Sequence, residues 1–244
     1  MLTYINVTIE NNPYKGGLVI KSTSNVDDIG DVASIVISRK RSDSNTWEEI
    51  YTISVAAIED FSFELVDYIT LSGVLYDYNF DIMDSTGVIP IESGIIHNTK
   101  CSFEGLFVGN ANRQYIAGAN FKTETNRNTQ VQHVTTLEGK YPYRVSNANT
   151  NYTTGKSAGL FLKLTEDKRR FVPDSDHSYS KEILDFLTDG TSKVIKTHDG
   201  QAWYVSIDAN PKEVYSDFIG AHSIDFSWTE IGDLPRSLMA GVDS

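Results

Sequence analysis

The sequence has few of the features on which covalent cross-links and membrane anchors depend. Cys101 is the single cysteine among 244 residues, which excludes an intrachain disulfide framework and a cysteine-based zinc site. Its place at an expected strand start favours a buried, inert thiol. No apolar run approaches the roughly 20 residues of a membrane helix, and the N-terminus lacks the basic and apolar segments of a secretory signal. We therefore expect no membrane insertion and synthesis in a reducing cytoplasm.

Basic residues are also scarce relative to acidic ones. Lys and Arg number 21 against 33 Asp and Glu, which gives a net charge of −12 and a pI near 4.8. A protein that binds nucleic acid without sequence preference needs basic residues to neutralise phosphates. We expect no stable nucleic-acid binding, and the acidic residues, spread along the chain, favour solubility.

The structural settings in which common catalytic motifs act are not predicted either. Ser85, Ser157 and Ser227 lack a strand-turn-helix elbow of the Gly-x-Ser-x-Gly kind, no Gly-Lys-Ser/Thr pattern opens a helix, and the histidines show no helical metalloprotease spacing. Asp174, Asp176 and His177 come nearest to a ligand cluster, but an oxygen site for calcium needs about six ligands, so a solvated turn is the simpler interpretation. We expect no catalytic residue, no cofactor and no metal ion.

The sequence does contain clear patterns that predict strands. Residues 1 to 98 alternate in polarity between turn residues and predict about seven short strands, the number expected of a β-sandwich. These strands are expected at residues 4–9, 18–21, 33–39, 49–55, 62–65, 76–82 and 88–91.

The first half also resembles an immunoglobulin- or fibronectin type III-like domain. The resemblance rests on the alternating strand Ile35 to Arg39, which Trp47 follows, and on Leu71 to Tyr78, which is similar to the tyrosine corner of that family. Trp47 and Ile50 resume the apolar pattern after the polar loop 40–45, and this spacing predicts a hairpin whose Trp47 closes the core. The polar segment His97 to Lys100 is the expected boundary to a second domain.

The second domain, residues 99–244, has its clearest pattern near the C-terminus. Residues 194–197 and 202–207 flank Asp199-Gly200, a pair that suits a tight hairpin turn. Trp203, Val205 and Ile207 repeat every two residues, as do Ile224, Phe226 and Trp228, so each set is expected on one face of a sheet.

One helix and two loops are expected in the same domain. Tyr179, Ile183 and Phe186 recur at helical spacing and predict a helix near 179–188, with Ser178 or Ser180 as its cap. Residues 122–130 and 147–156 are polar and predict mobile or extended loops. The fold class is therefore mostly β, with an N-terminal sandwich followed by a β-barrel-like domain with one helix.

The second half resembles tail-tip and baseplate hub proteins of phages of Gram-positive hosts, above all the distal tail protein group. The segments that carry the resemblance are Phe103–Val108, Gly139–Pro142, Asn151–Gly155, Gly159–Leu162, Leu187–Gly190, Lys193–Lys196, Asp199–Trp203 and Ser227–Gly232.

This resemblance implies a structural virion protein of a phage tail, which is a distal tail protein, a baseplate hub component or an adaptor. Its β-barrel would form a ring, a hexamer by the same resemblance, that continues the tail tube and connects it to the tip or baseplate. The implied partners are further copies of the chain, the tail tube, the tape measure protein and tip or baseplate components. The chain would be made in the cytoplasm of a host bacterium.

Aromatic and amide side chains supply the candidate binding or interface residues: Tyr141, Tyr143, Asn149, Tyr152, Trp203 and Trp228. Exposed rings and amides are also typical of a sugar-binding surface, so a carbohydrate- or receptor-binding module of a phage tail is the alternative function. A wall hydrolase is a third possibility, and it predicts a cleft that joins carboxylates such as Asp174, Asp176 and Glu182.

Overall fold

The computed structural model describes residues 2–135, 137, 140–165, 170–174, 176–208, 210–215 and 222–241. Strands dominate these residues, with a single α-helix, which confirms the mostly-β fold class. The elements are β1 (Ile5–Asn12), β2 (Gly17–Ser24), β3 (Val32–Arg41), β4 (Glu48–Ser54), the 3-10 helix η1 (Ile58–Phe61), β5 (Phe63–Asp67), β6 (Leu75–Asp84), β7 (Pro90–Lys100), β8 (Leu106–Gly109), β9 (Gln114–Val134), β10 (Tyr143–Phe161), α1 (Ser178–Leu187), β11 (Lys193–Thr197), β12 (Ala202–Ile207), β13 (Lys212–Tyr215), β14 (His222–Gly232) and β15 (Met239–Gly241).

The chain divides into two compact units, each built from separated segments. The first comprises residues 1–116, 194–202 and 234–244, and the second comprises residues 117–193 and 203–233. The predicted sandwich, residues 1–98, lies within the first unit. The units do not follow the predicted division at residue 98, because residues 99–116 and two later segments also belong to the first unit.

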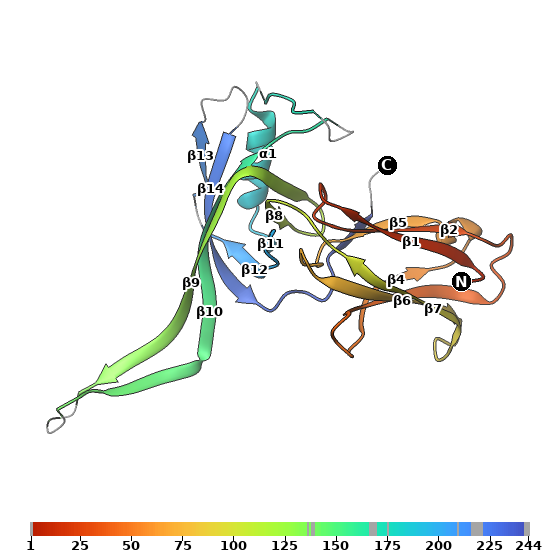
Figure 1. Ribbon diagram of the computed structural model, residues 1–244, viewed down its shortest axis with the longest axis horizontal. Helices are drawn as coiled ribbons and strands as arrows, with labels where there is room; N and C mark the ends of the chain where they lie inside the picture. Colours follow the sequence, from red (N-terminus) through yellow and green to blue (C-terminus); the bar gives the residue numbers. More distant parts are fainter. Residues whose placement is uncertain are drawn as a thin grey trace. The chain divides into compact units, whose positions relative to one another are not determined.

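Two four-stranded antiparallel sheets form the sandwich of the first unit (Figure 1). Their orders are β1-β2-β5-β15 and β4-β3-β6-β7. Ile35 and Ile37 of β3 lie opposite Ile82 and Phe80 of β6, and all four are fully buried. The alternation that predicted these strands is therefore the alternation that fills the core, and the expected seven strands are confirmed.

Trp47 does not close this core, contrary to the expectation. It precedes β4, is 37% exposed, and Lys40 Nζ lies 5.2 Å from the centre of its ring. The hydrogen bond from Leu71 N–H to Tyr76 Oη, 2.9 Å long, is of the type that a tyrosine corner makes. The fibronectin type III resemblance itself stays a prediction.

The polar segment His97 to Lys100 is not a break between strands but the end of β7. The ladder with β6 is irregular there, and Asn98 has a positive φ of 57°. Its N–H donates to Asp77 Oδ1 at 2.9 Å. A bulge therefore accommodates the polar residues inside the strand.

The remaining sheet has the order β10-β9-β8-β11-β12-β14-β13, and β10 also pairs with β14. That extra pairing closes six strands into a barrel, which confirms the barrel-like fold predicted for the second half. The turn between β11 and β12 is closed by the Gly200 N–H on Thr197 O at 3.1 Å, and Gly200 has the positive φ, 86°, that the Asp-Gly pair predicts. Ile224, Phe226 and Trp228 are buried, whereas Asp225 is exposed, as their alternation predicts.

The predicted helix is confirmed as α1, whose buried face includes Ile183, Phe186 and Leu187. The predicted serine cap is wrong. The carboxylate of Asp174 accepts the backbone N–H groups of Tyr179 and Ser180 at 3.0 and 2.9 Å. An acidic side chain outside the helix therefore satisfies two of the N–H groups that a helix start leaves without partners.

Two segments predicted as loops are strands. Residues 122–130 belong to β9, and residues 147–156 belong to β10. The sequence did not predict them as strands, because these segments are mostly polar and show no apolar alternation. Within the described residues, no helix is long and apolar enough to cross a membrane.

Candidate functional site

The two longest strands of the second unit form a hairpin with a free outer part. β10 pairs with β14 only from Thr154 to Phe161, whereas its pairing with β9 continues outward from there to Tyr143. Figure 1 shows β9 and β10 running out together beyond β14. We call residues 127–134 and 143–153 the arm.

The outer end of the arm presents apolar side chains to solvent. Val134 lies opposite Tyr143, and Val145 lies two residues further along the same face of β10. These side chains are 47%, 67% and 55% exposed, in that order. Tyr141, in the turn between the strands, is 72% exposed, with Lys140 Nζ 5.4 Å from its ring centre.

Polar side chains hold the base of the arm. Arg127 donates from Nε to Asn151 Oδ1 and from Nη1 to Thr153 Oγ1. Glu230 of β14 accepts the backbone N–H of Thr153 at 2.6 Å and lies 3.8 Å from Arg127 Nη1. The base of the arm is therefore held by hydrogen bonds and an ion pair.

Trp203 and Trp228 pack against each other and are not part of the arm. Trp228 is fully buried, donates from Nε1 to Ser157 Oγ at 2.9 Å, and has its ring centre 5.1 Å from that of the half-buried Trp203. A Cβ on Gly155 would lie 2.3 Å from Trp228 Cζ2, so only glycine fits there. Trp228 thus has no exposed surface with which to contact a partner.

The predicted interface residues are therefore divided. Tyr141 and Tyr143 are largely exposed near the outer end of the arm, and Tyr152, 39% exposed, lies at its base. Asn149 belongs to β10, but its side chain lies outside the described residues. The analysis of the sequence missed Val134 and Val145, although the alternation Tyr143-Arg144-Val145 could have indicated them.

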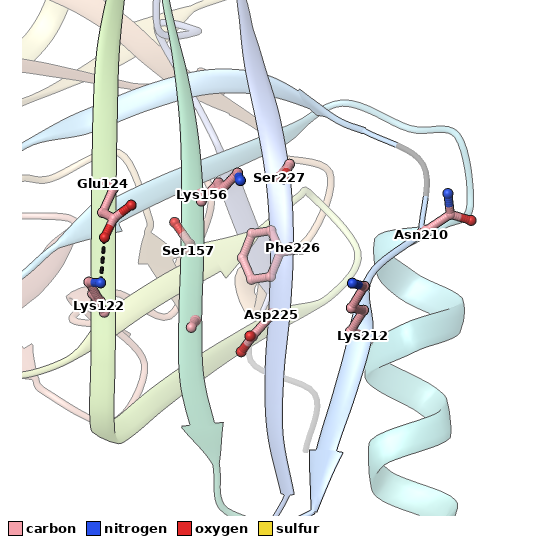
Figure 2. A pocket seen from close by; sticks show the side chains of 10 residues that line it. Lys122, Glu124, Lys156, Ser157, Asn210, Lys212, Asp225, Phe226 and Ser227 are labelled. Carbon is pink, nitrogen blue, oxygen red and sulfur yellow. Dashed lines mark ion pairs between the residues drawn. The ribbon is translucent and has the colours of Figure 1, made fainter.

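A pocket lies beside strands β9, β10, β13 and β14 (Figure 2). Half of the residues that line it are charged, with Lys122 and Glu124 on β9, Lys156 on β10, Lys212 on β13 and Asp225 on β14. Lys122 and Glu124 form an ion pair, with side chains 70% and 58% exposed. In solvent such charges are screened and interact weakly.

The carboxylates predicted for a hydrolytic cleft have structural partners. Although burial opposes the effect, hydrogen bonds from Ser180 and Tyr179 hold the pKa of Asp174 below its usual value. Asp176 accepts the hydroxyl of Ser178 at 2.8 Å, which is the main cause that lowers its pKa. Both are therefore ionised acceptors that organise the start of α1.

His177, expected in a solvated turn with these two residues, instead lies near Glu213 of β13 and His222 of β14. His222 is only 6% exposed. No spacing in the sequence indicates this cluster, because pairing of β13 with β14 brings Glu213 near His222 and the start of α1 adds His177.

In comparisons with known proteins, no protein-family model and no curated protein matches the chain. Among solved structures, a chain in the tail of an empty gene transfer agent particle, refined with C6 symmetry, has 13% sequence identity and a TM-score of 0.33, over 57% of this chain and 96% of that chain. A chain in the virion of a native gene transfer agent particle has 13% identity and a TM-score of 0.32, over 57% of this chain and 95% of that one. Likeness this slight defines neither the fold nor the function of this chain.

Proposed function

We propose that this chain is a structural virion protein of a phage tail, a distal tail or baseplate hub subunit that forms a ring between tail tube and tip. The sequence resemblance gives the class of protein. The observation that carries the proposal is the arm, whose apolar outer end is exposed in the single chain.

A two-stranded hairpin is marginal in water on its own. Exposed Val and Tyr side chains that gather on such a hairpin favour a protein partner that covers them. In a ring every copy meets an identical neighbour, so one arm can cover the same surface of each next copy. We therefore propose the arm as the contact between subunits, and further copies and other tail proteins as the partners.

Light scattering after size exclusion, over a range of concentrations, tests the ring. We expect a closed species, at six times the chain mass of 27.2 kDa for the hexamer. The variant Tyr143→Ser with Val145→Ser should shift the mass toward the monomer, because both side chains are exposed and their loss removes only the contact. Val88→Ser is the matched control, since Val88 is 77% exposed in the first unit. A wild type that stays monomeric at every concentration would contradict the ring.

A carbohydrate- or receptor-binding role is the second candidate. The exposed rings of Tyr141 and Tyr143 favour it, because sugars stack on exposed aromatic rings. A glycan array that gives a signal with wild type, and none with Tyr141→Ser, would support this role. An array without any signal would exclude the carbohydrate-binding role.

The proposal includes no catalytic role for this chain. This part of the proposal is supported by Asp174 and Asp176, whose carboxylates accept hydrogen bonds at the start of α1. The direct test is the turbidity of Gram-positive cell walls incubated with the protein. A steady fall in turbidity would overturn this part of the proposal.

A further inference from the structure

Three potential metal ligands from separate elements meet in the second unit. His177 directly precedes α1, Glu213 lies on β13, and His222 begins β14. Glu213 Oε1 lies 3.3 Å from His222 Nδ1 and 3.8 Å from His177 Nδ1. One ligand atom from each residue lies within 4.8 Å of the other two.

The backbone explains why the side chains converge. In the antiparallel ladder Tyr215 lies opposite His222, and Glu213 lies two residues before Tyr215. Residues two apart on a strand point to the same face, so Glu213 and His222 are diagonal neighbours on one face of the β13–β14 pair. His177 has a left-handed backbone, with φ 57°, and its ring centre lies 4.7 Å from that of His222.

The spacing matches the bond geometry of zinc. Zinc binds imidazole nitrogen and carboxylate oxygen at about 2.0–2.1 Å in a tetrahedral arrangement, which separates neighbouring ligand atoms by about 3.3 Å. The pair of Glu213 and His222 has this separation, 3.3 Å. His177 Nδ1 lies 3.8 Å from Glu213 Oε1, so the half-exposed His177 must move closer to its partners to complete the site.

The burial of the three groups also suits a bound cation. The side chain of Glu213 is 18% exposed and that of His222 is 7% exposed, whereas that of His177 is 50% exposed. Within the described part of the chain, the buried Glu213 Oε1 accepts no hydrogen bond. A buried carboxylate oxygen in this state is costly, and a cation between Glu213 and the two imidazoles would remove that cost.

We propose that His177 Nδ1, Glu213 Oε1 and His222 Nδ1 bind one divalent transition-metal ion, with zinc as the preferred ion. Two imidazoles and one carboxylate form a ligand set that suits zinc, and the half-exposed side of His177 leaves the fourth position to water. The ion ties the start of α1 to β13 and β14. This inference goes beyond the proposed function, does not rest on it, and departs from the expectation of no metal site.

The test uses the full-length chain without an affinity tag, stripped with a chelator and titrated with Zn²⁺ by calorimetry. We expect one ion per chain. Glu213→Gln should weaken binding about tenfold or more, since loss of even an outer partner of a metal ligand costs that much. Co²⁺ should give the visible absorption of a tetrahedral site in wild type and not in Glu213→Gln.

His97→Ala is the matched control. His97 Nδ1 lies 3.3 Å from Asp77 Oδ2, the same separation as in the proposed site, but this pair belongs to no cluster of three ligands among the described residues. The variant should bind Zn²⁺ as wild type does. Equal affinities for wild type and Glu213→Gln would overturn the proposal, as would binding that disappears in His97→Ala.

Thermal unfolding gives an independent readout, because a ligand that binds only the folded state raises the unfolding midpoint. Zn²⁺ should raise the midpoint of wild type and of His97→Ala, but not that of Glu213→Gln. If Glu213→Gln does not fold by circular dichroism, His177→Ala takes its place, since half of that side chain is exposed. If excess Zn²⁺ leaves the wild-type midpoint unchanged, the ion binds only weakly at the surface, and the proposed site is overturned.

Discussion

At the scale of single residues, the first unit depends on two buried charged groups. Asp67 is fully buried, and its carboxylate accepts from Arg39 Nη1, Tyr78 Oη and the backbone of Ile69. Burial, with Asp67 as the next cause, raises the pKa of Tyr78 well above its usual value, so this phenol remains a neutral donor. Lys196 is the second group and donates to Gly16 O and Thr70 O.

Replacing Asp67 with Asn should destabilise the protein strongly. The substitution leaves the buried guanidinium of Arg39 without its counter-charge, which costs about 3–5 kcal/mol of unfolding free energy. Urea unfolding followed by circular dichroism measures the change. Glu124→Gln, which breaks an ion pair on the surface, is the control and should leave the midpoint unchanged. Similar midpoints for the two variants would show that the buried pair does not stabilise the unit.

Because of Lys196, the free energy of unfolding should change with pH in the alkaline range. Burial lowers its pKa from 10.5 to about 8 in the folded chain. Between these values the unfolded chain holds the proton and the folded chain does not, so the free energy of unfolding rises with pH. The rise is at most about 3 kcal/mol, at 1.36 kcal/mol for each unit of pKa.

Chemical unfolding of wild type and of Lys196→Met, from pH 7 to pH 10.5, measures this contribution. The difference in unfolding free energy between the two proteins should stay constant below pH 8 and then change in favour of wild type. A constant difference over the whole range would contradict the lowered pKa.

At the scale of elements, one glycine controls how closely β10 approaches β14. Gly155 lies opposite Trp228, and a Cβ there would meet the indole and the backbone oxygen of Glu124, at 2.8 Å from the latter. The six-stranded closure of the barrel depends on this pairing.

Gly155→Ala should therefore destabilise the second unit by about 1–3 kcal/mol, the usual cost of overpacking a core. Differential scanning calorimetry measures the change. Gly118→Ala is the control on the neighbouring strand β9, because a Cβ at Gly118 meets nothing within 4 Å. An equal loss in the two variants would point to strand flexibility instead of the indole contact.

At the scale of the whole molecule, charge opposes association between copies. The net charge is −12 at pH 7. Charges beyond about 8 Å are largely screened at an ionic strength of 0.15 M. Added salt should therefore favour the assembled species at a given concentration, as measured by light scattering at low and at moderate ionic strength. Assembly that weakens with salt would indicate that opposite charges hold the subunits together.

The sequence by itself determined the elements whose side chains alternate. Isoleucine and phenylalanine at every second position predicted β3, β6 and β14, and helical spacing predicted α1, because burial of one face leaves a period in the residue order. It also indicated Tyr141 and Tyr143 as exposed, but it could not show that Trp47 lies outside the core.

The tertiary structure alone decided the arm and the cluster of His177, Glu213 and His222. Most residues of the arm are polar, and its few apolar residues alternate only near the outer end, so pairing between β9 and β10 defines its strands. In the cluster, pairing of β13 with β14 brings Glu213 near His222, and the start of α1 adds His177. Register is set by which strand faces are buried and by the turns between strands, so the spacing of these three residues along the sequence does not reveal the cluster.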